Sequence, residues 1–230
     1  MNLKIKLCLL IVVFSLVKTT AQTAPDLSNY PLHVQYKRSS KPVLVYLTGD
    51  GGWNSFSEGL INELGKDGYA TIALDTRKYF WSAKTPDEFA RDMKVILSVY
   101  LKAWNKDSFS IIGYSFGADV GSFLPGHLPE QLSAKISSLI LLSPGLSTGY
   151  VVKLKNMLNF GASTANEKYK VYPELLKSNI PVWCVFGKEE ESDFYKLLKE
   201  TDKIHKVNVP GNHHYNDDIP VVAKAILKGL

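Results

Sequence analysis

The chain has 230 residues, 45% of them hydrophobic, and a formal net charge of +5. This length supports one substantial core and is too short for two comfortable ones. Three lysines, Lys4, Lys6 and Lys18, lie in the first 21 residues with no acidic residue beside them, so the net charge falls from +5 to +2 without that segment. So weak a positive charge argues against nucleic acid as a partner.

Residues 1–21 have the pattern of a secretory signal peptide. Lys4 and Lys6 precede a nearly unbroken apolar run at 7–17, and small or polar residues follow it. The apolar run is too short to remain in a bilayer as a mature anchor. We therefore expect residues 1–21 to be removed on export and the mature protein to lie in the periplasm.

The remaining sequence alternates between strand and helix patterns. Residues 22–41 are polar and interrupted by prolines, which predicts a lead-in segment. In chain order, the pattern then predicts a strand at 42–48, a helix at 54–66, a strand at 69–74, a helix at 85–104, a strand at 109–112, a helix at 118–124, strands at 138–142, 181–186 and 206–209, and a closing helix at 219–230. The less regular segment 150–177 predicts a small helical insertion that shapes a substrate site. Such alternation predicts an α/β fold at 42–230, with a doubly wound, mostly parallel sheet and helices on both faces.

A G-x-S-x-G pentapeptide at 113–117 follows the third predicted strand and precedes a helix. Glycines on both sides of Ser115 allow a tight turn that lifts the serine out of the sheet. Because the strand–turn–helix context is met, Ser115 is the candidate nucleophile.

A serine nucleophile needs a base and an acid, which in doubly wound hydrolases follow later strands in that sheet. The loop after the last strand carries His213 and His214, and we favour His213 as the base because it falls two residues after a glycine. His214 remains the alternative. The acidic loop after the preceding strand offers Glu190 as the acid, with Asp193 as an alternative there.

Backbone amides complete the candidate site. The Gly-rich loop at 48–53 lies beside the serine in a parallel sheet, so the amides of Asp50 and Phe116 are the expected oxyanion donors. The histidine pair has no clustered third ligand, and Cys184 lies among apolar residues. We therefore expect neither a metal nor an organic cofactor.

Four motifs together closely resemble the VirJ/AcvB family of bacterial virulence-associated proteins. They are LTGDGGW at 47–53, the segment 75–86 with YFW at 79–81, GYSFGAD at 113–119 and PGNHHY at 210–215. The resemblance runs from about residue 42 to the C-terminus and implies an exported branch of the α/β-hydrolase fold. It also implies hydrolysis of the aminoacyl ester of aminoacyl-phosphatidylglycerol, in its lysyl or alanyl form, by Ser115 with one of His213 and His214 and an acid in the 189–193 loop.

This substrate is an aminoacylated anionic phospholipid that brings its own ammonium group. We expect Asp50 or Asp119 to receive that group, although a carboxylate at Asp119 also suits the first turn of a helix. Trp53 and Trp81 are expected to line the substrate site, and an aromatic rim there would make transient contact with a membrane surface. The alternatives are a periplasmic esterase or thioesterase for soluble substrates, and a non-catalytic binding protein associated with secretion.

Overall fold

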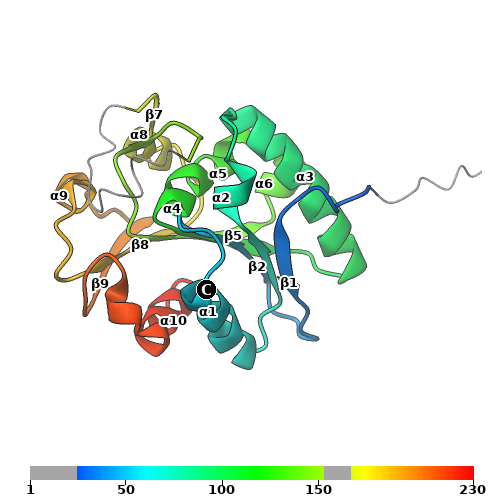
Figure 1. Cartoon of the computed structure of the whole chain (residues 1–230), viewed down its shortest axis with the longest axis horizontal. Helices are drawn as coiled ribbons and strands as arrows, with labels where there is room; N and C mark the ends of the chain where they lie inside the picture. The colour runs from blue at the N-terminus through cyan, green and yellow to red at the C-terminus, as the bar shows by residue number, and fades with distance from the viewer. Residues whose placement is uncertain (1–24, 153–166) are drawn as a thin grey trace, which may run out of the picture.

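A seven-stranded sheet forms the centre of the protein. Figure 1 shows the computed structural model, which describes residues 25–152 and 167–230. The strands are β1 (Leu32–Gln35), β2 (Val43–Leu47), β3 (Thr71–Leu74), β4 (Phe109–Tyr114), β5 (Ile136–Leu142), β8 (Val182–Gly187) and β9 (Ile204–Val209). Their order is β1-β3-β2-β4-β5-β8-β9, and every neighbouring pair is parallel except β1 with β3. The expected mostly parallel sheet is therefore confirmed.

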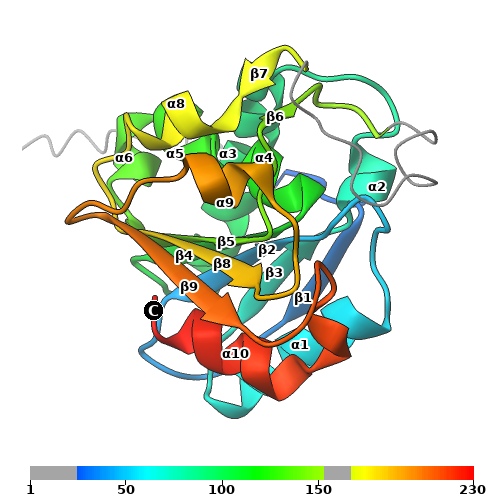
Figure 2. The ribbon, with the colours of Figure 1, turned by 90° about the vertical axis from the view of Figure 1, so that its left-hand side faces the viewer.

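Helices cover both faces of this sheet. They are α1 (Ser55–Lys66), α2 (Thr76–Tyr79), α3 (Pro86–Ala103), α4 (Phe116–Gly121), α5 (Leu124–His127), α6 (Glu130–Ser133), α8 (Val171–Leu175), α9 (Asp193–Leu197) and α10 (Ile219–Leu227), with a 3₁₀ turn at Tyr215–Asp217. Figures 1 and 2 show α1 and α10 side by side on one face, and α3 with α4 to α6 on the other. This arrangement is the doubly wound fold that the sequence predicted.

The central strands are mostly apolar and buried because both of their faces are covered. Val43, Leu44, Val45 and Leu47 of β2 are all fully buried. Their side chains alternate between two hydrophobic clusters, one beneath α3 and α4 and the other beneath α1 and α10. The predicted helix at 85–104 begins as expected, with a capping box between Thr85 and Glu88.

The segment 22–41 is more than a lead-in. Its residues 32–35 form β1, which pairs with β3 in antiparallel register and makes the edge of the sheet. No strand was expected there because β1 is a short mixture of apolar and polar residues, none of which is buried. The predicted signal peptide at 1–21 lies outside the described residues, as do residues 22–24.

The described part of the predicted insertion contains both strand and helix. Within the described residues, β6 (Ser147–Thr148) and β7 (Tyr169–Lys170) form a two-stranded antiparallel ribbon, and the short α8 follows directly. Residues 153–166 of the predicted insertion lie outside the described part of the chain. The ribbon and α8 lie on the same side of the sheet as α4 (Figure 2).

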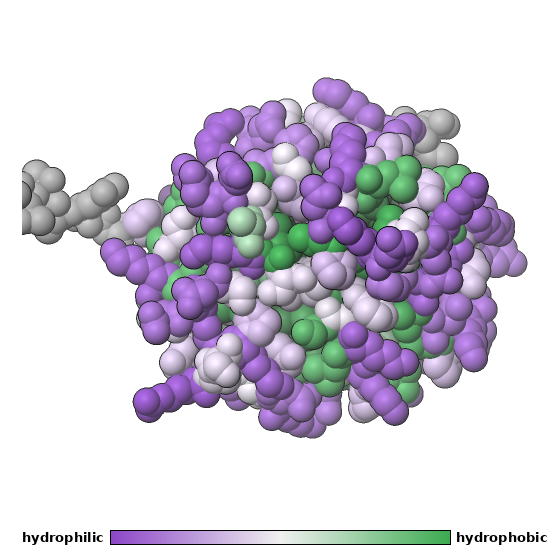
Figure 3. All heavy atoms as spheres, turned by 180° about the vertical axis from the view of Figure 1, so that it is seen from behind, coloured by the Kyte–Doolittle hydropathy of each residue, from purple (hydrophilic) through white to green (hydrophobic). Residues whose placement is uncertain are grey.

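In Figure 3, one face of the molecule is covered largely by hydrophilic side chains, with apolar side chains in small groups between them. Among the helices of residues 25–152 and 167–230, none combines the length and the apolar character needed to cross a bilayer.

Candidate active site

Ser115 occupies a strained turn between β4 and α4. Its backbone has φ 51° and ψ −118°, and a positive φ is unusual for a residue with a side chain. The Ser115 amide donates to the carbonyl of Leu142 at the end of β5 (2.8 Å), which fixes the turn to the neighbouring strand. This sharp turn is the geometry that exposes a nucleophile above an α/β sheet.

Glycine is required where α4 leaves this turn. A Cβ at Gly113 would lie 2.4 Å from the carbonyl oxygen of Gly117, and a Cβ at Gly117 would lie 2.3 Å from the carbonyl oxygens of Leu47 and Thr48. Both contacts are with backbone atoms, which cannot move aside as a flexible side chain can. The two glycines therefore let α4 begin directly against β4 and the end of β2.

Two hydrogen bonds join the predicted nucleophile, base and acid. Ser115 Oγ lies 3.0 Å from Nε2 of His213, and Nδ1 of His213 lies 2.8 Å from Oε1 of Glu190. Because a carboxylate only accepts, Nδ1 carries the hydrogen and Nε2 is left to accept the serine hydroxyl. This is the arrangement that serine hydrolases use.

The loops that carry His213 and Glu190 touch through their backbones. A Cβ at Gly187 would lie 2.2 Å from the carbonyl oxygen of Asn212. The amide of Glu189 donates to the carbonyl of Gly211 at 3.0 Å. The acid and the base are therefore held together by the main chain as well as by their own hydrogen bond.

The alternative base and acid have other partners. Nδ1 of His214 lies 2.8 Å from the hydroxyl of Tyr114, and its ring stands perpendicular to that of His213. Asp193 begins α9 and pairs with Lys196 at 3.0 Å on the surface. The structure thus brings His213 and Glu190 to Ser115, rather than His214 and Asp193.

The two predicted oxyanion donors are backbone amides at the ends of neighbouring elements. Phe116 is the first residue of α4, where a helix has no internal partner for its amide, and Asp50 follows the end of β2. Among the described residues, neither amide donates a hydrogen bond. Because Gly117 packs against Leu47 and Thr48, these free amides lie on segments in direct contact.

Asp119 lies one turn beyond Ser115 and is buried. Its Oδ1 accepts a hydrogen bond from the amide of Gly145 at 2.6 Å, which ties α4 to the loop after β5. Burial is the main cause that raises the pKa of this carboxyl to about 8; the Gly145 amide opposes the rise, and the negative charge of Asp50 adds to it. Asp50, by contrast, is partly exposed.

The two tryptophans differ in position. Trp53 stacks on His33 of β1, with ring centroids 4.0 Å apart and planes nearly parallel. Trp81 is 60% exposed, and the preceding Phe80 meets the ring of Phe116 edge to face at 5.3 Å. Trp81 is therefore the exposed aromatic of a segment that borders the nucleophile turn.

One contact of the acid was not foreseen from the sequence. The hydroxyl of Ser143, the residue after β5, donates to Oε2 of Glu190 at 2.7 Å. The hydroxyl of Tyr215 lies 2.6 Å from the same serine oxygen. Tyr215 lies in the predicted histidine loop, but no local pattern marks a serine at the end of a buried strand as its partner.

The described residues contain neither a candidate metal site nor a reactive cysteine. No group of three or more His, Cys, Asp or Glu side chains in residues 25–152 and 167–230 could hold a metal ion. Burial raises the pKa of the Cys184 thiol, so this cysteine stays protonated in the core.

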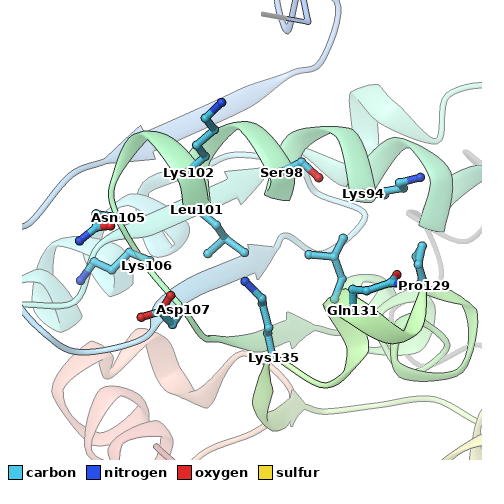
Figure 4. A pocket seen from close by; sticks show the side chains of 11 residues that line it. Lys94, Ser98, Leu101, Lys102, Asn105, Lys106, Asp107, Pro129, Gln131 and Lys135 are labelled. Carbon is cyan, nitrogen blue, oxygen red and sulfur yellow. The ribbon is translucent and has the colours of Figure 1, made fainter.

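A surface hollow of about 470 Å³ lies at the opposite edge of the sheet, near the amino ends of β4 and β5 (Figure 4). Three of its lysines, Lys94, Lys102 and Lys135, point in different directions. The ammonium of Lys106 already donates to the carbonyls of Ser39 and Lys41, at 2.6 and 2.8 Å. The hollow is therefore separate from the residues around Ser115 and does not gather these cations on one point.

The reactivity of Ser115 should depend on His213 and not on His214. We expect His213→Gln to slow labelling of Ser115 by a fluorophosphonate probe roughly 10⁴-fold or more, because the hydroxyl loses its proton acceptor. His214→Gln is the matched control and should keep most of the labelling rate. Equal losses in the two variants would contradict the assignment of His213.

The pH dependence of the protein's stability should reflect the raised pKa of Asp119. The pKa of this group rises from 3.8 to about 8 on folding, so between these values the folded protein holds a proton that the unfolded chain has released. This group therefore makes the protein less stable as pH rises through that range. Asp119→Asn retains an oxygen for the Gly145 amide but cannot titrate, so the variant should gain stability relative to wild type between about pH 5 and about pH 8. Urea unfolding at both pH values measures the difference, and an equal difference at both would contradict the buried neutral carboxyl.

Several solved structures are similar to this fold. Est1E from Butyrivibrio proteoclasticus shares 17% identity with a TM-score of 0.60, over 86% of this chain and 90% of that one. The carboxylesterase CesB from Bacillus subtilis shares 13% with a TM-score of 0.61, over 87% and 88%. MenH from S. aureus shares 16% with a TM-score of 0.61, over 88% and 98%. At these identities the likeness establishes the α/β-hydrolase fold.

A search of proteins with curated descriptions finds no significant match. A family match, however, covers residues 41–230 and so includes Ser115, Glu190 and His213. It carries the description "Bacterial virulence protein (VirJ)". The chain therefore belongs to the VirJ family of bacterial virulence proteins, as its motifs predicted.

Proposed function

We propose that this protein is an exported serine hydrolase that cleaves the aminoacyl ester of aminoacyl-phosphatidylglycerol. The observation that carries the hydrolase part is the hydrogen-bonded chain from Ser115 through His213 to Glu190, at 3.0 and 2.8 Å. The neighbouring folds, which include a named carboxylesterase, agree with ester chemistry. The lipid substrate and the periplasmic location rest on the resemblance to the VirJ/AcvB family and on the signal-peptide pattern of residues 1–21.

The reaction follows from the positions of these groups. His213 Nε2 takes the hydroxyl proton as Ser115 Oγ attacks the ester carbonyl, and Glu190 stabilises the imidazolium that forms. The free amides of Asp50 and Phe116 receive the negative oxygen. His213 then gives its proton to the departing glycerol oxygen, which leaves an aminoacyl group on Ser115. Water, activated by the same imidazole, releases the amino acid and restores the serine.

Asp50 is the best candidate for recognising the aminoacyl group. A carboxylate beside an oxyanion site opposes the developing negative charge, so its presence makes sense when the substrate carries a cation. The α-ammonium of an aminoacyl ester lies one carbon from the scissile carbonyl, and Asp50 is partly exposed next to an oxyanion amide. Asp119 is less suited, because its carboxyl is buried and already binds the Gly145 amide.

Contact with a membrane surface would bring the lipid substrate to the site. Trp81 supports this part of the proposal, since it is 60% exposed beside the Phe80–Phe116 contact and aromatic side chains favour the headgroup region. Loss of vesicle binding in Trp81→Ala, measured by co-sedimentation, tests it.

The decisive experiment is hydrolysis of lysyl- and alanyl-phosphatidylglycerol in vesicles by the purified protein. We expect release of the free amino acid by wild type and none above background by Ser115→Ala. Turnover of soluble esters or thioesters alone would favour the soluble-substrate alternative. A protein whose Ser115 neither turns over any ester nor reacts with a fluorophosphonate would be a binding protein.

Asp50→Asn tests recognition of the ammonium group. The variant keeps its backbone amide and the size of its side chain, so the oxyanion donor is retained. We expect kcat/KM for aminoacyl-phosphatidylglycerol to fall on the order of 10-fold, while a neutral short-chain ester is cleaved at least as well as by wild type. Equal loss with both substrates would refute charge recognition by Asp50.

A further inference from the structure

We propose that Ser143 and Tyr215 are positioning residues, whose two buried hydroxyls hold the carboxylate of Glu190 in the orientation that His213 requires. The proposal rests on the serine-hydrolase function above and adds two groups to the machinery of that site. Neither side chain touches Ser115 in the hydrogen bonds described, so both would act through Glu190.

The hydrogen bonds of these side chains form one continuous network. Ser143 Oγ donates to Glu190 Oε2 at 2.7 Å, Tyr215 OH lies 2.6 Å from Ser143 Oγ, and Tyr215 OH also lies 3.0 Å from the carbonyl oxygen of Val185. Ser143 is 2% exposed and Tyr215 is fully buried, while 9% of the Glu190 side chain is accessible. Water is therefore largely kept from this side of the carboxylate, and the serine hydroxyl takes its place.

The number of available hydrogens determines which group donates in each of these hydrogen bonds. An ionised Glu190 can only accept, so the single hydroxyl hydrogen of Ser143 points to Oε2. The contact between Ser143 and Tyr215 then needs the hydrogen of the tyrosine, which lies between Ser143 Oγ and the more distant Val185 carbonyl. Burial raises the pKa of Tyr215, so this hydroxyl keeps its hydrogen. The Ser143 hydroxyl therefore directs its hydrogen to the carboxylate, while the single hydrogen of Tyr215 is shared between Ser143 Oγ and the Val185 carbonyl.

The backbone at both residues is unusual in a way that supports this role. Ser143 has φ 48° and Tyr215 has φ 55°, conformations that are costly for residues with side chains. The turn at Ser143 is held by its amide, which donates to Val185 at 2.8 Å, and the turn at Tyr215 by its amide, which donates to Asn212 at 2.9 Å. The fold thus retains two strained turns: the side chain of Ser143 contacts Oε2 of Glu190, and the side chain of Tyr215 contacts the Ser143 hydroxyl.

The consequence is a carboxylate with both oxygens engaged. Oε1 accepts from His213 and Oε2 accepts from Ser143, so the plane of the carboxylate is fixed from two sides. A carboxylate held only at Oε1 could rotate about its terminal bond and lengthen the bond to His213. Charge-assisted hydrogen bonds of this kind are among the strongest in proteins.

Ser143→Gly is the most informative variant, since glycine adopts a positive φ without strain while the hydroxymethyl group is removed. We expect the labelling rate of Ser115 by a fluorophosphonate, and kcat for the ester substrate, to fall on the order of 10- to 100-fold with KM little changed. Tyr215→Phe, which keeps the buried ring, should cause a smaller loss. Because Tyr215 acts through Ser143, the double variant should be no slower than Ser143→Gly alone.

Ser138→Ala is the matched control. Ser138 lies on the same strand β5, is 3% exposed, and donates to the hydroxyl of Ser110 at 3.0 Å, away from the site. This variant loses a buried hydrogen bond as well, so it should lose some stability while the labelling rate of Ser115 is maintained. A Ser143→Gly protein that also labels at the wild-type rate would overturn the proposal.

A second measurement reads the position of Glu190 directly. The proton between His213 Nδ1 and Glu190 Oε1 should give a low-field NMR resonance, and this resonance should move in Ser143→Gly and stay in place in Ser138→Ala. An unmoved resonance in Ser143→Gly would overturn the proposal even if wild type cleaved no ester. A labelled wild type with no turnover of aminoacyl lipid would refute the proposed substrate, while the labelling rates would still decide the roles of Ser143 and Tyr215.

Discussion

The hydrogen bond between His213 and Ser115 joins residues that lie 98 positions apart, and the arrangement of the site depends on it. It can form because the nucleophile, the acid and the base each follow a strand of one parallel sheet, so the three loops emerge at the same edge. Side chains alone do not hold these loops together. At Gly117 and Gly187 the backbones approach so closely that a Cβ would collide with carbonyl oxygens. The spacing of the reacting groups is therefore set by main-chain contact, which is stiffer than contact between long side chains.

The charges around Ser115 form a coherent pattern. Two free amides, at Asp50 and Phe116, suit a negative oxygen, while two carboxyl groups, at Asp50 and Asp119, would oppose it. Burial of Asp119 resolves part of this conflict, because a carboxyl with a pKa of about 8 is mostly neutral at neutral pH. The remaining carboxylate, Asp50, then provides a single negative charge beside the oxyanion amides. This pattern supports the proposal that the substrate carries a cation next to its ester carbonyl.

Much of the fold could be predicted because its signals are local. The strand at 42–48 is an uninterrupted apolar run, and the helix from Thr85 carries its own capping box, so neither depends on distant residues. Ser115 is similarly marked by the glycines that its turn requires. The acid was harder to identify, since several carboxylates share one loop and the contact that distinguishes Glu190 comes from His213. Ser143 was missed for the same reason, because its partners Glu190 and Tyr215 are 47 and 72 residues away.

The edge strand β1 extends the folded domain beyond the residues that the family match covers. Its residues 32–35 pair with β3, yet they precede residue 41, where the family match starts. A chain trimmed to that boundary would expose the main-chain amides and carbonyls of β3, together with the aromatic face of Trp53 that now stacks on His33. Open strand edges of this kind recruit further strands from other molecules. The sequence-family border and the physical border of the domain therefore differ, and a fragment cut at the former would be prone to self-association.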